Sequence, residues 1–143
     1  MNIQRLESEA LAGSTVAQAI LGICYLDGID VQPDYAKASR WLSLAAEKGA
    51  SRAMLHLGRI YEDGLGVTRA ITRALELYKA ASDRHEFFSH IYLGRIYATG
   101  KGGVSRDERA ALVYYGRAAA EAEHLVDCPE IHEAIAYVEA HRS

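Results

Sequence analysis

Cysteine, proline and long apolar runs are scarce in this sequence of 143 residues, and each scarcity argues against a class of protein. Two cysteines, Cys24 and Cys128, lie far apart and in no motif, which favours a reducing compartment over a disulfide scaffold. No window approaches the run of about 18 apolar residues that a membrane helix needs. The first residues do not resemble a secretory signal, so we expect a cytoplasmic location, although a mature chain without its signal would look the same.

Motifs for catalysis and for metal or cofactor binding are also missing. None of the six histidines has a second histidine four residues away, as a helical zinc site requires. No phosphate loop, dinucleotide fingerprint or nucleophile elbow occurs. A net charge of −3 does not suggest nucleic acid, for which a strongly basic domain is expected. We therefore predict no catalytic residue, no metal, no cofactor and no enzyme activity.

What the sequence does contain is an internal repeat. Three glycines, Gly22, Gly58 and Gly94, recur every 36 residues, each directly after a leucine and three residues before a tyrosine. The stretch Leu-Gly-Arg-Ile-Tyr is identical in the second and third copies. A fixed period of this length predicts stacked supersecondary units. Because alanine is abundant and β-branched runs are few, the composition indicates an all-α protein.

Each repeat is predicted to contain two helices joined by a turn, in a single domain over residues 1–143. The repeating glycine lies inside the first helix, where it costs about 1 kcal/mol relative to alanine, so we expect a close helix crossing there. Ser14, Ser105 and Asp127 are predicted to cap helices. The repeats are expected at about 14–49, 50–85 and 86–122, with first helices near 14–27, 50–63 and 86–99, second helices near 33–48, 69–84 and 106–122, and terminal capping helices at 2–12 and 128–141.

The repeating unit resembles the Sel-one-like repeat family, whose members are relatives of the tetratricopeptide repeats. The resemblance covers about 14–122. In the second repeat Ala70 stands where the family has an aspartate, and the third repeat has one extra turn residue. The first repeat carries the pattern best, with Ala17, Leu21-Gly22, Tyr25, Gly28, Val31, Asp34, Ala38, Trp41-Leu42, Ala45-Ala46 and Gly49.

The resemblance implies a right-handed α/α superhelical solenoid of three helix-turn-helix repeats. It also implies a function, because family members serve mostly as adaptors that assemble protein complexes in signalling, quality control and contact between bacteria and hosts. Fold alone does not fix function. A small-molecule or peptide carrier, and least of all an enzyme with a groove site, remain as alternatives.

By analogy with such solenoids, the first helix of each repeat lines a concave groove. Residues at i, i+4, i+7 and i+11 of that helix share one side. In the three repeats these are Val16, Ile20, Ile23 and Asp27, then Arg52, His56, Arg59 and Asp63, then Phe88, Tyr92, Arg95 and Thr99. We predict a partner-binding groove formed by Ile20, Ile23, Arg52, His56, Arg59, Phe88, Tyr92 and Arg95.

Arg59 and Arg95 stand at the same position one repeat apart. Guanidinium groups bind carboxylates with two parallel hydrogen bonds, so the expected partner is a protein or peptide segment with an acidic residue or a C-terminal carboxylate. The alternative is that these arginines pair with Glu62, Asp63 or Glu86 on a solvated face. Self-association through an end or through the concave face also stays open, and no membrane partner is expected.

Overall fold

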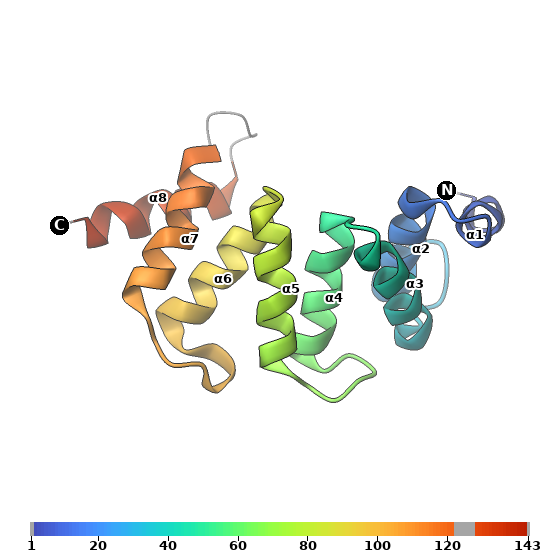
Figure 1. Cartoon of the computed structure of the whole chain (residues 1–143), viewed down its shortest axis with the longest axis horizontal. Helices are drawn as coiled ribbons and strands as arrows, with labels where there is room; N and C mark the ends of the chain where they lie inside the picture. The colour runs from blue at the N-terminus through green and yellow to red at the C-terminus, as the bar shows by residue number, and fades with distance from the viewer. Residues whose placement is uncertain (1, 122–127, 143) are drawn as a thin grey trace. The chain divides into compact units, whose positions relative to one another are not determined.

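The computed structural model describes residues 2–121 and 128–142, and over these residues it is built of helices joined by turns (Figure 1). This confirms the predicted all-α class with paired helices and a helix at each end. The described α-helices begin and end within two residues of the predicted positions, and the longer turn predicted in the third repeat contains a short 3-10 helix. They are α1 Ile3–Leu11, α2 Thr15–Asp27, α3 Tyr35–Glu47, α4 Ser51–Asp63, α5 Ile71–Asp83, α6 Phe87–Thr99, the short 3-10 helix η1 Lys101–Gly103, α7 Glu108–Glu121 and α8 Pro129–His141.

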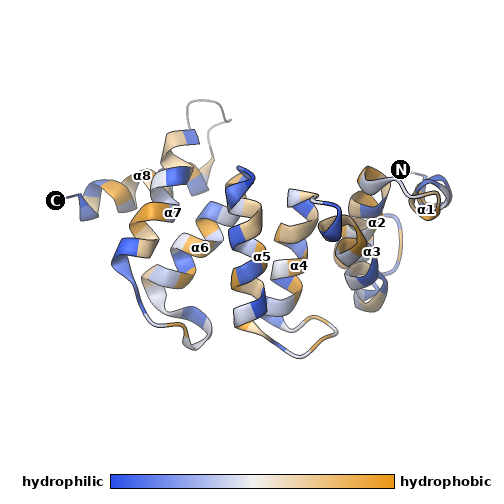
Figure 2. Cartoon of the chain, in the orientation of Figure 1, coloured by the Kyte–Doolittle hydropathy of each residue, from blue (hydrophilic) through white to orange (hydrophobic). Residues whose placement is uncertain are grey.

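The chain divides into two compact units, Met1–Arg84 and His85–Ser143. The first unit contains α1 to α5 and the second contains α6 to α8, and each has its own hydrophobic core. Hydrophobic and hydrophilic residues alternate along the helices, as expected for amphipathic helices that each bury one side (Figure 2). The single domain predicted over residues 1–143 stays a prediction.

The helices pack as consecutive neighbours within each unit. In the first unit α2 packs on α3 and α4 on α5, α3 joins the two pairs, and α1 covers α2. In the second unit α6 packs on α7, and α8 covers α7. Leu21 is fully buried on α2, and Leu57 and Leu93 take the same place on α4 and α6. The apolar stripe predicted from the repeat is therefore the side of each first helix that enters the core.

A side chain of the partner helix packs directly against the glycine inside each first helix. A Cβ atom placed on Gly58 would lie 2.6 Å from the Tyr78 ring, and one on Gly22 would lie 2.6 Å from Leu42. At Gly94 the same atom would lie 2.9 Å from Tyr115. These distances are shorter than a carbon–carbon contact allows, so the predicted close crossing explains why glycine recurs in spite of its helical cost.

The residues that cap the N-termini of the helices agree only in part with the predicted caps. The Ser14 hydroxyl accepts a hydrogen bond from the Ala17 N–H at 3.2 Å, as predicted. The predicted cap at Ser105 is wrong, because Asp107, directly before α7, accepts from the Ala110 N–H at 3.1 Å instead. Asp107 occupies the same repeat position as Asp34, which caps α3. In the second repeat this position is Ala70, whose methyl group cannot accept a hydrogen bond, so α5 has no side-chain cap. The cap predicted at Asp127 lies outside the described residues.

Candidate functional site

The predicted groove residues of the first unit lie on α2 and α4 outside the fully buried core, although Ile23 packs against the edge of that core. Arg52 is exposed, and His56 and Arg59 are half-buried on α4. Ile20 and Ile23 are half-buried on the neighbouring helix α2. We call Ile20, Ile23, Arg52, His56 and Arg59 the α4 face.

His56 and Arg59 form the polar centre of the α4 face. Arg59 Nη1 donates to His56 Nδ1 at 3.0 Å. Burial, followed by the positive charge of Arg59, lowers the pKa of His56 to about 4. The carboxylate of Asp27 opposes this shift in pKa, and Arg52 has a smaller lowering effect. The imidazole is therefore neutral at pH 7, and its Nδ1 atom can accept a hydrogen bond from the Arg59 guanidinium. The α4 face thus carries two guanidinium charges and a neutral histidine.

The nearby carboxylates that were the alternative partners of Arg59, Glu62 and Asp63, do not pair with it. Glu62 is buried, and its Oε1 atom accepts from the Tyr78 hydroxyl at 2.7 Å. Asp63 is exposed at the end of α4. Among residues 2–121 and 128–142, no carboxylate lies within ion-pair distance of Arg59. Its guanidinium therefore contacts the neutral His56, and Asp27 of α2 is the carboxylate whose charge acts on this histidine.

Arg95, at the same repeat position in the second unit, has a carboxylate partner. Its Nε atom lies 2.9 Å from Glu133 Oε1, and its Nη2 atom lies 2.6 Å from Glu133 Oε2. The Tyr115 hydroxyl also donates to Glu133 Oε1, at 2.8 Å. The hydrogen bond from Arg95 holds the pKa of Glu133 below its ordinary value, and burial followed by the bond to Glu133 raises the pKa of Tyr115.

Sequence reasoning missed Glu133 because it follows the last recognisable repeat. The spacing of Ile131 and Ala134 on α8, both buried, was the available signal, since it places Glu133 at the edge of the packed side. Phe88, on α6, is 40% exposed, and Tyr92 is half-buried. They lie outside the core on the same helix as Arg95, as predicted.

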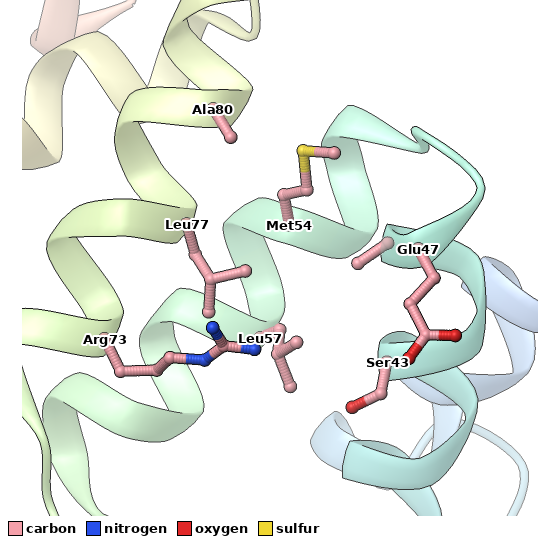
Figure 3. Close-up of a pocket in the computed structure, with 8 residues that line it drawn as sticks. Ser43, Glu47, Met54, Leu57, Arg73, Leu77 and Ala80 are labelled. Carbon is pink, nitrogen blue, oxygen red and sulfur yellow. The ribbon is translucent and has the colours of Figure 1, made fainter.

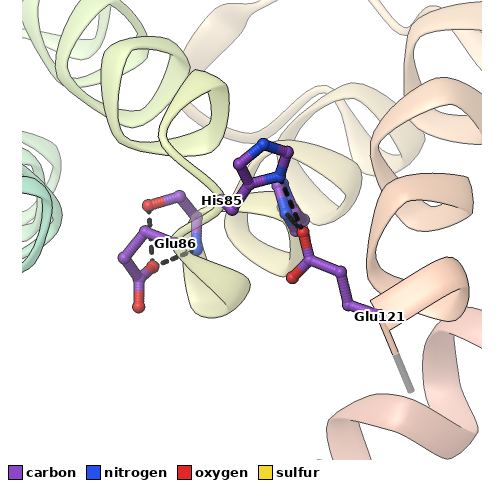
Figure 4. Close-up of polar contacts among 5 residues, drawn as sticks. His85, Glu86 and Glu121 are labelled. Atoms are coloured by element: carbon purple, nitrogen blue, oxygen red, sulfur yellow. Dashed lines mark hydrogen bonds and ion pairs between the residues drawn. The ribbon is translucent and has the colours of Figure 1, made fainter. Parts of the chain in front are cut away.

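A second polar cluster in the second unit joins α6 to the end of α7 (Figure 4). Glu121 Oε1 lies 2.9 Å from His90 Nε2 and 3.4 Å from His85 Nδ1. His90 is fully buried, whereas the side chain of His85 is exposed. Glu86 begins α6 by accepting from the Ser89 N–H at 2.8 Å. These bonds fix the start of α6 against α7 and give the cluster a structural role.

A pocket of about 260 Å³ lies between α3, α4 and α5 in the first unit, and sequence reasoning did not find it (Figure 3). Met54 and Leu57 of α4 form its floor, and Leu77 of α5 lines one side. The signal in the sequence is the small size of the neighbouring side chains, which leave the space open. The remaining lining residues are Ser43, Ala46, Glu47, Arg73 and Ala80.

Several kinds of site have no support among the residues that the structure describes. No group of three or more His, Cys, Asp or Glu side chains there is placed to hold a metal ion. In the same part of the chain, no helix combines the length and the apolar character that crossing a membrane requires. Cys24 is buried, and burial is the main reason that its pKa is raised, so the thiolate needed for nucleophilic chemistry is disfavoured.

Paired helices that present varied residues outside a repeated core define an α-helical repeat protein. The profile of the Sel1 repeat family matches residues 15–49, 51–85 and 88–122. The chain belongs to the Sel1 repeat family, which confirms the predicted resemblance and its three repeats. Sel1-repeat proteins are generally protein-interaction modules, and their fold is typically a non-catalytic scaffold.

Two solved structures share the fold. A Sel1 repeat protein from Oxalobacter formigenes is 30% identical, with a TM-score of 0.74, over 83% of this chain and 48% of that one. A protective antigen present in uropathogenic Escherichia coli strains, which displays an SLR fold, is 27% identical, with a TM-score of 0.79, over 96% of this chain and 33% of that one. The present chain thus spans half or less of each relative. No curated protein matches the sequence.

Proposed function

We propose that this protein is a cytoplasmic adaptor that binds an acidic protein segment on the α4 face. The observation that carries the proposal is Arg59 itself, a half-buried residue whose guanidinium forms no ion pair among the described residues. Burial of a charge without a counter-charge is costly, so an incoming carboxylate would gain more here than at a fully solvated arginine. Arg52 adds a second positive charge on the same side of the helix.

The second unit supports the chemistry of this proposal. There, Arg95 binds the carboxylate of Glu133, a residue of helix α8. The pair uses two guanidinium nitrogens and both carboxylate oxygens, which is the strong, directional form of this interaction. An arginine at this repeat position can therefore bind an acidic residue on a packed helix, and Arg59 offers the same group to a partner.

The apolar side chains of the α4 face supply the rest of the proposed contact. Ile20 and Ile23 are half-buried beside α4, so a partner that covers them removes apolar surface from water. Because both side chains are already partly buried, covering one of them contributes less than the roughly 1.5–3 kcal/mol expected for a fully exposed aliphatic side chain. We therefore expect a segment that combines an aliphatic residue with a glutamate, an aspartate or its own C-terminal carboxylate.

Phe88, Tyr92 and Arg95 of α6 stay in the proposal as further contacts. Phe88 offers exposed aromatic surface, and aromatic residues are frequent at the energetic centres of interfaces. Arg95 is already bound to Glu133, so a partner would have to compete with α8 for it. For this reason we place the principal anchor at Arg59.

Affinity capture with three baits tests the proposal: the wild type, Arg59→Glu, and Arg40→Glu as a matched charge reversal at an exposed arginine of α3. Circular dichroism establishes that all three fold. The dissociation constant of the captured partner, once purified, should rise at least about tenfold for Arg59→Glu and less than about twofold for Arg40→Glu. Equal binding by all three would remove the α4 face from the proposal. Light scattering of the free protein separately checks the predicted self-association.

A further inference from the structure

The pocket of the first unit lies on a different side of α4 from the α4 face. Met54 is two residues from Arg52, which is roughly 200° around a helix. The floor of the pocket is apolar and well packed, because Met54 and Leu57 are only 7% and 2% exposed. Leu77 of α5 extends this apolar surface up one side.

Small side chains keep the pocket open above this floor. Ser43 and Ala46 on α3 and Ala80 on α5 are too short to reach across the gap between the two helices. The volume of about 260 Å³ is enough for one large aliphatic side chain. An aliphatic group that enters the pocket would contact Met54, Leu57 and Leu77, and its apolar surface would be removed from water.

Opposite charges stand on the two rims of the pocket. Glu47 lies on the α3 rim and Arg73 on the α5 rim (Figure 3). Among the described residues the two do not form an ion pair. Arg73 makes a 3.6 Å contact with Glu76, in which both side chains are more than half exposed, and lies 5.9 Å from the Tyr61 ring centroid. Such an exposed pair is weak, so Arg73 can exchange it for another carboxylate.

We propose that this pocket docks a partner-protein segment in which one aliphatic side chain is flanked by a basic residue on one side and an acidic residue on the other. The aliphatic side chain fills the pocket. The basic residue meets Glu47 and the acidic residue meets Arg73. A lysine in the central position would place its charge over an apolar floor and close to Arg73, which disfavours it. This site does not depend on the α4 face.

Nuclear magnetic resonance of the methionine methyl groups tests the docking directly, because the chain has only two methionines, Met1 and Met54. The full chain, labelled with ¹³C at these methyl groups, is titrated with blocked Lys-Gly-Leu-Gly-Glu and with its reverse, Glu-Gly-Leu-Gly-Lys. We expect at least one of them to shift the Met54 signal saturably, while the Met1 signal stays in place. Matched peptides with glycine or lysine at the centre should leave Met54 unchanged.

Three results would overturn the proposal: no shift of Met54 by either leucine peptide, a shift of equal size by the glycine peptide, or tighter binding of the lysine peptide. Charge reversal sharpens the test without changing the core. Glu47→Lys should weaken the leucine peptide at least about threefold, and an exchange of the two peptide charges should restore part of that loss. Unchanged affinity in Glu47→Lys would also contradict the proposal.

Arg59→Glu serves as the control that separates this site from the α4 face. It should leave the Met54 shift intact even if it abolishes capture of an acidic partner. Ala80→Leu should fill the pocket and suppress the shift. If that variant does not fold, the conclusion rests on Glu47→Lys, which alters only an exposed side chain.

Discussion

Arg59 and Arg95 occupy the same position in two identical five-residue stretches, yet their surroundings differ. Arg95 is bound to Glu133 of α8 through both carboxylate oxygens. Arg59 contacts a neutral histidine and no carboxylate among the described residues. The same local sequence thus yields a structural ion pair in the second unit and, in the first, an arginine without an ion pair among the described residues.

A single replacement in the repeat accounts for part of this difference. Tyr78 of α5 donates its hydroxyl proton to Glu62, which belongs to the same repeat. One repeat later, position 98 is alanine in place of that glutamate. Tyr115, the counterpart of Tyr78, therefore takes Glu133 of α8 as its acceptor. The role of a repeat position is set by the helix that covers it as well as by its own motif.

The largest effect is expected where the two units are most alike, at the glycine crossing. Gly58→Ala would drive a methyl group into the fully buried Tyr78 ring, so we expect a loss of about 1–3 kcal/mol of unfolding free energy. Gly116→Ala is the matched control, because a methyl group there meets nothing within 4 Å among the described residues beyond its own stretch of helix, and it should stabilise α7 by up to about 1 kcal/mol. Urea denaturation measures both, and equal effects would show that the crossing does not constrain position 58.

The second prediction concerns the pH dependence of stability that His56 gives to the first unit. The pKa of His56 is lowered from 6.5 to about 4 by burial and by Arg59, so the unfolded chain binds a proton that the folded chain does not. Stability from this group is complete above pH 6.5 and is lost as the pH falls to about 4, by roughly 1–2 kcal/mol after allowance for solvent screening. His56→Gln should remove this dependence. A His56 resonance that titrates near pH 6.5 in the folded protein would disprove the assignment.

The third prediction concerns the ion pair of the second unit. Glu133→Gln should lower the free energy of unfolding by about 1 kcal/mol, because Arg95 and Tyr115 lose a charged acceptor. Arg59→Gln should cost less than about 0.5 kcal/mol, because no ion pair among the described residues is broken. Since the pKa of Glu133 is lowered in the folded state, its contribution is present above the ordinary carboxyl pKa and disappears as the pH falls through the folded pKa. Thermal unfolding as a function of pH measures the stability of both variants. Equal losses of unfolding free energy would contradict the proposed difference between Arg95 and Arg59.

The smallest expected effect is a gain. Ala70 has the extended backbone of a helix cap but no oxygen to accept a hydrogen bond, whereas Asp34 and Asp107 cap the equivalent helices. Ala70→Asp should therefore stabilise α5 by about 0.5–1 kcal/mol. Ala70→Leu, which also lacks an acceptor, is the control, and urea denaturation of the two variants gives the comparison. No gain with aspartate would mean that the backbone N–H groups of α5 are already satisfied.

The repeat made the fold predictable from the sequence. Three copies in register mark which positions are packed, because Leu21, Leu57 and Leu93 recur while the residues beside them change. The same logic placed Arg52, His56 and Arg59 outside the core, where the structure has them. Periodicity reports the environment of a position that is shared by all copies, and burial is such a property.

The missed features depend on contacts that no period encodes. Glu133 lies on α8, beyond the repeats, so its pairing with Arg95 could not be read from spacing. The pocket results from side chains that are too small to fill the space between α3 and α5, such as Ser43 and Ala80. Ser105 was chosen as a cap because its spacing suits one, but Asp107 lies next to the helix and competes successfully.

The difference between Arg59 and Arg95 can be measured most directly from the Nε–H resonances of the two arginines. The full chain is titrated with a blocked acidic peptide, Leu-Gly-Glu-Gly-Leu, and the matched glutamine peptide is the control. If Arg59 is the open carboxylate site, its signal shifts saturably with the glutamate peptide alone, while the signal of Arg95, held by Glu133, stays in place. An unmoved Arg59 signal, or equal shifts at both arginines, would contradict the assignment of the α4 face as the binding surface.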